Sequence, residues 1–230
     1  MYAADSAVML LDNRKGVEER TRQLFQVCRR RRMPIVTFVN KCDRAGEDPL
    51  RLISDVEADL GIGCYPMTGP VFRDGGFVGV YDRQRKDVLL FARNEDHGAS
   101  RVETRRGHID APGIEDLLGE ENLRHLLESV SLLDAAGHEF SVEALLAGEL
   151  TPVYFGSALN NFGVEPFLEE FLQLAPAPTE RASSAGPVSP LSPDLTAFVF
   201  KIQANMDPRH RDRIAFLRIC SGRFEGGMTV

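Results

Sequence analysis

The feature that most constrains the fold is a pair of short apolar runs with a helical stretch between them. The first run is Ala7–Leu11, which ends at Asp12, and the second is Ile35–Val39, which is apolar or β-branched throughout. Continuous apolar runs of this length suit the buried strands of a parallel sheet. Between them, apolar residues recur at helical spacing, namely Val17, Leu24, Val27 and Cys28. Strand, helix and strand in this order predict a right-handed βαβ unit.

The rest of the first 175 residues extends this α/β pattern and adds an inserted α+β segment at about residues 64–150. The periodicity predicts helices over residues 50–60, 120–136, 142–147 and 162–174, a hairpin over residues 77–81 and 88–91, and a strand over residues 151–155. We therefore expect residues 1–175 to form one α/β domain with a partial parallel sheet.

The remaining residues change in character twice. Residues 176–194 are rich in Pro, Ala, Ser and Gly, which is typical of a linker. Residues 196–203 and 213–221 then alternate apolar and polar side chains, as strands do. Because two strands cannot make an independent domain, we expect residues 195–230 to be the truncated start of a second, all-β domain.

Composition excludes several classes of protein. The formal net charge of −7 argues against a chain that coats nucleic acid through bulk charge. Asp5 interrupts any signal-peptide pattern, and no apolar run approaches the roughly 20 residues that span a bilayer. We therefore expect a soluble, cytoplasmic protein without membrane contact. The four cysteines lack a C-x-x-C pair and the five histidines lack ligand spacing, so we expect reduced thiols and no metal site.

Asn40-Lys41-Cys42-Asp43 matches the N-K-x-D pattern that recognises guanine. Asp43 would accept hydrogen bonds from the N1–H and the N2 amine of the base, a pair of donors that adenine lacks. Asn40 can contact the N7/O6 side and tie neighbouring loops together. Lys41 can lay its aliphatic stem along the ring and keep its ammonium group in water. The motif follows an apolar strand, where open α/β sheets bind ligands. A polar turn with no ligand is the competing interpretation.

Ser157-Ala158-Leu159 is the candidate second half of the site. The tripeptide follows the predicted strand at residues 151–155 and precedes a helix. Such a loop can present the backbone N–H of Ala158 to the guanine O6, with Ser157 bracing the turn.

A phosphate-binding loop of the form G-x-x-x-x-G-K-[ST] needs a lysine preceded by glycine. None of the lysines of this chain follows a glycine, so we expect no such loop here. Asp110-Ala111-Pro112-Gly113 matches the D-x-x-G pattern that holds magnesium and the γ-phosphate in GTPases, but no apolar strand leads into it. We therefore predict that it is a turn.

With these motifs in place, the sequence resembles the bacterial peptide-chain release factor three family of ribosome-dependent GTPases. This resemblance implies that residues 1–175 are the C-terminal part of a GTP-binding domain of the P-loop-GTPase type, and that residues 195–230 are the truncated start of a β-barrel domain. The resemblance runs over nearly the whole chain. It is carried by Asp5–Asp12 with Gly16–Glu18 and Arg20–Arg22, by Thr37–Arg44, by Phe155–Val164 and by Phe198–Arg213. The last of these is similar to the entry of that family into its β-barrel domain, where elongation-factor relatives differ.

The resemblance implies a translation termination factor. An intact member would bind GTP or GDP with Mg²⁺ and hydrolyse GTP to GDP and phosphate. Hydrolysis on the ribosome, which offers both RNA and protein contacts, would promote recycling of the codon-reading release factor, and the factor would be a monomer. An intact member also has a phosphate loop and two switch regions. We expect this chain to lack them, and with them any catalytic residue or magnesium ligand.

Other interpretations remain open at this point. The chain could be a non-catalytic remnant, an elongation-factor-like protein or a ribosomal-protection GTPase. The basic turn that contains Arg209, Arg211 and Arg213 is either a contact with ribosomal RNA phosphates or a solvent-facing loop.

Overall fold

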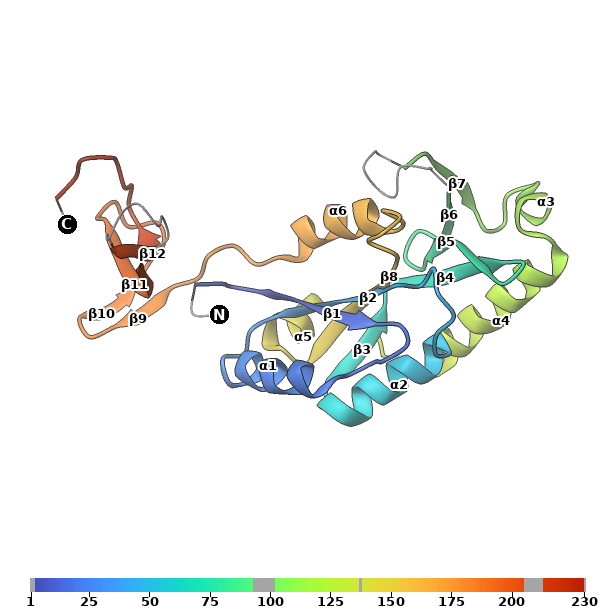
Figure 1. Ribbon diagram of the computed structural model, residues 1–230, viewed down its shortest axis with the longest axis horizontal. Coiled ribbons are helices and arrows are strands. Elements are labelled where there is room, and N and C mark those ends of the chain that lie inside the picture. The colour runs from blue at the N-terminus through green and yellow to red at the C-terminus, as the bar shows by residue number, and fades with distance from the viewer. Residues whose placement is uncertain (1–2, 93–101, 137, 205–212, 230) are drawn as a thin grey trace. The chain divides into compact units, whose positions relative to one another are not determined.

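The computed structural model describes residues 3–92, 102–136, 138–204 and 213–229. The chain divides into two compact units (Figure 1). The larger unit comprises Ser6–Ala175, and the smaller one comprises Met1–Asp5 together with Pro176–Val230. In the described part of the chain, no helix is long and apolar enough to cross a membrane.

The larger unit is built around a parallel sheet whose described strands lie in the order β1-β2-β8-β3. Its strands are β1 (Ala7–Asp12), β2 (Ile35–Asn40), β3 (Gly63–Pro66) and β8 (Leu150–Phe155). The helices that accompany them are α1 (Glu19–Arg30), α2 (Pro49–Leu60), α5 (Val142–Ala147) and α6 (Val164–Leu174). The predicted βαβ unit and the α/β class are therefore confirmed.

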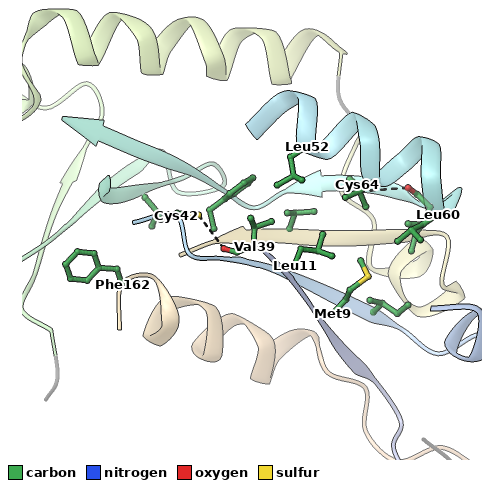
Figure 2. Close-up of a cluster of buried hydrophobic side chains, with 14 of the residues drawn as sticks. Met9, Leu11, Val39, Cys42, Leu52, Leu60, Cys64 and Phe162 are labelled. Carbon is green, nitrogen blue, oxygen red and sulfur yellow. Dashed lines mark hydrogen bonds between the residues drawn. The ribbon is translucent and has the colours of Figure 1, made fainter. Parts of the chain in front are cut away.

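Side chains alternate between the two faces of this sheet, and each face has its own core. On one face, Leu11 and Val39 pack with Leu52 of α2 and with α1 (Figure 2). On the opposite face, Phe38 packs against Phe167 of α6, with ring centroids 4.9 Å apart. Helices cover both faces of β2 and β8, and this explains why those two strands are buried almost along their whole length and are mostly apolar.

The predicted burial of the first strand is only half right. Met9 and Leu11 are buried, but Val8 is 40% and Leu10 63% exposed. Val8 and Leu10 lie on the same face as Val36 and Phe38, and on that face the core with α6 includes β2 and β8 but not these two residues of the edge strand β1. The helical face predicted for α1 was also wrong in part. Leu24 and Val27 are exposed, whereas α1 buries Phe25 and Cys28.

A second, antiparallel sheet lies within the predicted insertion, with its described strands in the order β4-β5-β6-β7. These strands are β4 (Thr68–Arg73), β5 (Gly76–Asp82), β6 (Asp87–Phe91) and β7 (Thr104–His108). The helices of this segment are α3 (Ile114–Leu118) and α4 (Glu120–Ala136). The predicted hairpin is confirmed as β5 and β6, which pair antiparallel. The same segment contains β3, β4 and β7, which the sequence pattern did not indicate.

In the smaller unit, the two predicted strands are confirmed as β11 (Thr196–Ala204) and β12 (Arg213–Ser221), which pair antiparallel. Part of the segment expected to be a linker forms a short hairpin of β9 (Arg181–Ser183) and β10 (Gly186–Val188). Asp5 accepts hydrogen bonds from Arg181 and Arg218, both at 2.5 Å, and so ties the start of the chain to this unit.

Candidate nucleotide-binding site

Two loops leave the same edge of the parallel sheet and are joined by their backbones. One loop follows β2 and contains the N-K-x-D motif; the other follows β8 and contains Ser157-Ala158-Leu159. The N–H of Gly156 donates to the carbonyl oxygen of Val39 at 2.9 Å, and the N–H of Cys42 donates to the oxygen of Gly156 at 3.1 Å. The structure therefore brings together the two motifs, which are more than a hundred residues apart in the sequence.

The side chain of Asn40 links the loops a second time. Its Oδ1 accepts hydrogen bonds from the backbone N–H of Lys41 at 2.8 Å and from that of Ala158 at 2.9 Å. The N–H that the sequence assigned to the guanine O6 is therefore already used by Asn40. A base oxygen at this position would have to share the Ala158 N–H with Asn40.

Lys41 is held in an unusual geometry. Its φ of 69° lies in the left-handed region, which non-glycine residues seldom adopt. Its Nζ lies 2.6 Å from Oδ2 of Asp12, at the end of the neighbouring strand β1. The hydrogen bond from Lys41, with a second from the N–H of Arg14, lowers the pKa of the Asp12 carboxyl. The ammonium group is thus fixed beside the base-recognition motif.

Asp43 has an unsatisfied acceptor. Its Oδ1 is buried and has no hydrogen-bond partner among the described residues. Buried polar atoms in folded proteins are nearly always paired, so each exception calls for a specific explanation. The neighbouring Cys42 points into the core, where its Sγ donates to the oxygen of Val39 at 3.5 Å (Figure 2). Burial raises the pKa of the Cys42 thiol to about 12, so it is neutral at physiological pH.

The second loop is compact and rests on two glycines. Ser157 is fully buried and exchanges backbone hydrogen bonds with Phe162, at 2.9 and 3.0 Å. A Cβ on Gly156 would lie 2.5 Å from the oxygen of Phe162, and Gly163 has a φ of +75°. Only glycine suits these two positions. Leu159, by contrast, is 52% exposed at the tip of the loop.

Two residues that sequence reasoning did not assign to the site support it. Asp12 pairs with Lys41, and Asn13 is 4% exposed and braces the loop after the motif. The N–H of Asn13 donates to the oxygen of Asn40 at 2.9 Å, and the oxygen of Asn13 accepts from the N–H of Glu47 at 3.1 Å. Their signal was available in principle, because parallel pairing of the two predicted strands places Asp12 opposite Asn40.

The other sequence candidates lie elsewhere or outside the described residues. The D-x-x-G match at Asp110 is a turn after β7, as predicted, and its carboxylate lies 3.6 Å from Nδ1 of His108. Arg209 and Arg211 lie outside the described residues, and Arg213 is exposed at the start of β12. Among the described residues, no three His, Cys, Asp or Glu side chains converge as a metal site. The structure describes all four cysteines, and none of them is in a disulfide.

Both units resemble domains of known translation factors. Residues 1–177 match the model of the elongation factor Tu GTP-binding domain, and residues 194–230 match that of elongation factor G domain 2. A crystal structure of a Thermus thermophilus protein superimposes with a TM-score of 0.68 and 28% identity, covering 98% of this chain and 33% of that one.

Curated relatives are similar along the whole chain. Peptide chain release factor 3 of Symbiobacterium thermophilum is 53% identical over 230 residues, which are all of this chain and 43% of that protein. The protein of the same name from Synechocystis sp. is 48% identical over the same length, which is 42% of that protein. The chain thus spans less than half the length of these relatives. At this level of identity over its full length, the chain belongs to the peptide chain release factor 3 family.

Proposed function

We propose that this chain reads the guanine base of GTP or GDP in a translation termination factor. In the whole protein, GTP hydrolysis to GDP and phosphate on the ribosome would promote recycling of the codon-reading release factor. The observation that carries the proposal is the buried, unpartnered Oδ1 of Asp43, beside two loops that Asn40 holds together. The matches to translational GTPases support it, and neither family model favours a remnant without nucleotide chemistry.

The residues fit a guanine base by their chemistry. Asp43 is an acceptor that lacks a donor, and guanine presents two adjacent donors at N1 and N2. Both hydrogen bonds of the Asn40 side chain to the described residues are accepted by its Oδ1, so its amide nitrogen can donate to N7 of the base. Ala158 would share its N–H between Asn40 and the base O6 in a three-centre bond.

Discrimination follows from the cost of burying an unpaired carboxylate. Adenine offers no pair of donors to Asp43. In a complex with adenine, the buried Oδ1 would therefore stay unpaired, and this would weaken binding by about 1–3 kcal/mol, or by more because the group is charged. The contacts of the base alone support only weak binding, with a dissociation constant on the order of millimolar. Lys41 adds apolar contact through its stem while Asp12 keeps its ammonium in place.

The residues described above bind the base and take no part in GTP hydrolysis. Bound GTP would supply the free energy of hydrolysis, and we assign no residue of this chain to Mg²⁺ or to the attacking water. Arg213 is our proposed RNA contact, because it is exposed and phosphate contacts need only local positive charge. Because it would act on the ribosome, we place the factor in the cytoplasm. We also propose that the intact factor is a monomer.

The test of base recognition uses nucleotides that differ only in the base. Binding of GMP, IMP, XMP and AMP to the chain would be measured by NMR titration. We expect GMP to bind most tightly, IMP to be weaker because it lacks the N2 donor, and AMP not to bind. Equal binding of GMP and AMP would contradict the proposal, and no binding of any nucleotide would favour the remnant.

Two variants sharpen the result. Asp43→Asn should lose GMP preference and gain XMP, because the xanthine C2 oxygen needs a donor. Glu47→Gln removes one negative charge from the same loop at a half-exposed site, so it should leave the order of nucleotides unchanged. If both variants shift the preference equally, general charge and not base reading explains the binding.

A chimera tests the proposed recycling role. The aligned segment of the Symbiobacterium relative would be replaced by this sequence, and release-factor recycling on ribosomes would be assayed with GTP. We expect activity close to that of the parent. A folded chimera that binds GDP but does not recycle the release factor would limit the proposal to base recognition.

A further inference from the structure

The antiparallel sheet β4–β7 contacts the core that lies beneath the two base loops. Leu89 and Phe91 of β6 belong to the same buried cluster as Cys42, the third residue of the N-K-x-D motif (Figure 2). Val88 of the same strand belongs instead to a separate cluster with Leu126 of α4. The sheet therefore presents one face to the base loops and the other to its own helices.

Phe162 is the residue through which the second loop makes this contact. Its side chain is buried, and its ring centroid lies 5.1 Å from that of Phe91 and 6.2 Å from that of Phe77 in β5. Aromatic rings at about 4.5–7 Å attract each other beyond the effect of the area that they bury. Phe162 also exchanges two backbone hydrogen bonds with Ser157, so the position of its ring is linked to the closure of the loop.

Two further contacts of the sheet flank the loop. Before the loop, Oγ1 of Thr68 in β4 accepts a hydrogen bond from the N–H of Phe155 at 3.0 Å. After the loop, Nη1 of Arg85, in the turn between β5 and β6, donates to Asp82 at 2.6 Å and to Glu170 of α6. The sheet thus holds the chain before, within and after the second base loop.

The backbone of the loop supplies little of this order by itself. Gly156 and Gly163 stand at its two ends, and glycine loses more conformational freedom on folding than any other residue. Contacts made elsewhere must therefore compensate for the ordering of the loop. Of the large apolar side chains between the two glycines, Leu159 is 52% exposed, whereas Phe162 is buried against the sheet.

We propose that the sheet β4–β7 positions the second base loop, and that Phe91 is the positioning residue, acting through the ring of Phe162. Affinity for a guanine nucleotide then depends on a contact outside the base site. The inference rests on the proposed function, because this loop presents Ala158 to the base. The competing explanation is that the ring pair only stabilises the domain.

The experiment uses two replacements of Phe91 and one control. Phe91→Leu keeps an apolar side chain but removes the ring pair, and Phe91→Ala removes both. Val88→Ala is the control, because Val88 is 1% exposed on the opposite face of the same strand. For each full-length variant, we would measure hydrogen exchange of the Ser157 and Phe162 amides, GMP binding by NMR titration, and unfolding in urea.

The two faces of β6 should give different results. In Phe91→Leu, the Ser157 and Phe162 amides should exchange about 2- to 12-fold faster, which is the contribution of one aromatic pair. GMP should bind more weakly by about the same factor, because ordering of the loop then opposes binding. Phe91→Ala should change both quantities further. Val88→Ala should unfold at lower urea concentration, while both amides and GMP affinity keep their native values.

Several results would overturn the proposal. Native exchange rates or native GMP affinity in the Phe91 variants would show that this ring does not position the loop for the base. Equal effects of Val88→Ala and Phe91→Leu would show that lower stability, and not the ring contact, weakens binding. If Phe91→Ala does not fold, Phe91→Leu decides the question. If the native chain binds no nucleotide, the proposed function fails, and the exchange rates still decide whether Phe91 holds the loop.

Discussion

Asn40 is the residue whose replacement best separates the structure of the site from its chemistry. Its Oδ1 accepts one hydrogen bond from Ala158 in the other loop and one from Lys41 in its own loop. Its amide nitrogen is the group proposed to face the base. Asn40→Ala removes the acceptor and the donor together. Asn40→Asp has nearly the same shape and keeps an oxygen at the accepting position, but it replaces the donor with a second acceptor and adds a negative charge.

The two hydrogen bonds accepted by Oδ1 determine how much free energy of local opening Asn40→Ala should remove. A net hydrogen bond contributes about 0.5–1.5 kcal/mol. Lys41 and Ala158 are both exposed, so water can reach their freed N–H groups and the cost stays near the lower end. We expect Asn40→Ala to lower the free energy of local opening by about 1–2 kcal/mol in total. Asn40→Asp should match or exceed the stability of the native chain, because a carboxylate is the stronger acceptor.

The assay is hydrogen exchange of single amides in the folded chain. In Asn40→Ala, the Ala158 amide should exchange about 5- to 30-fold faster, which corresponds to 1–2 kcal/mol. The Met67 amide, which donates to Val153 at 2.9 Å on the far side of β8, is the internal reference and should not change. In Asn40→Asp, the Ala158 amide should exchange at the native rate or more slowly, while GMP binding is lost.

Two results would refute this reasoning. If Ala158 exchanges at the native rate in Asn40→Ala, the side chain does not hold the loops together. If Asn40→Asp behaves like Asn40→Ala in exchange, the acceptor at this position is not what stabilises the contact. Retention of full GMP binding by Asn40→Asp would remove the proposed role of the amide nitrogen.

Three further predictions concern the larger unit. Gly156→Ala should destabilise it by about 2–3 kcal/mol in urea unfolding, because the new Cβ would lie 2.5 Å from a backbone oxygen; Gly69→Ala, with nothing within 4 Å, is the control and should change little. Tyr154→Phe should cost about 1–2 kcal/mol, because the phenol donates to Glu170 at 2.8 Å and is buried; a stability equal to the native value would contradict this. Burial raises the pKa of Cys42 in the folded chain from 9.0 to about 12, so the neutral thiol stabilises the fold fully below pH 9 and this stabilisation is lost as the pH rises towards 12. In Cys42→Ala, the free energy of unfolding should therefore fall less steeply between pH 9 and pH 12. An equally steep fall in the variant would show that Cys42 does not cause the loss.

The strands that the sequence predicted well are those buried on both faces of the sheet. β2 and β8 are covered on both faces, so a continuous apolar run was enough to identify them. β4 was missed because Gly69 and Pro70 suggest a turn, although proline is tolerated in an edge strand such as this one. β7 was missed because its five residues are mostly exposed and carry no apolar alternation.

The same distinction explains what was predicted of the site. The N-K-x-D motif and the Ser157 loop could be placed together because parallel strands end at one edge of their sheet. The role of Asp12 could not be predicted from its own neighbours, since it depends on the register that places Asp12 beside Asn40. The sequence predicted that Asn40 ties neighbouring loops together. It did not predict that its partner is the Ala158 N–H, because that contact joins loops more than a hundred residues apart and no local pattern encodes it.

The contacts that shape the site all lie within the larger unit. Asp12 comes from the end of β1, Asn40 and Lys41 from the end of β2, and Gly156 from the end of β8. Three adjacent parallel strands thus deliver the groups, and backbone hydrogen bonds between the loops fix their spacing. A geometry set by strand register does not depend on the phosphates of a nucleotide. Base selectivity should therefore be measurable with a monophosphate even where overall affinity is weak, and this is why the GMP series is the decisive comparison.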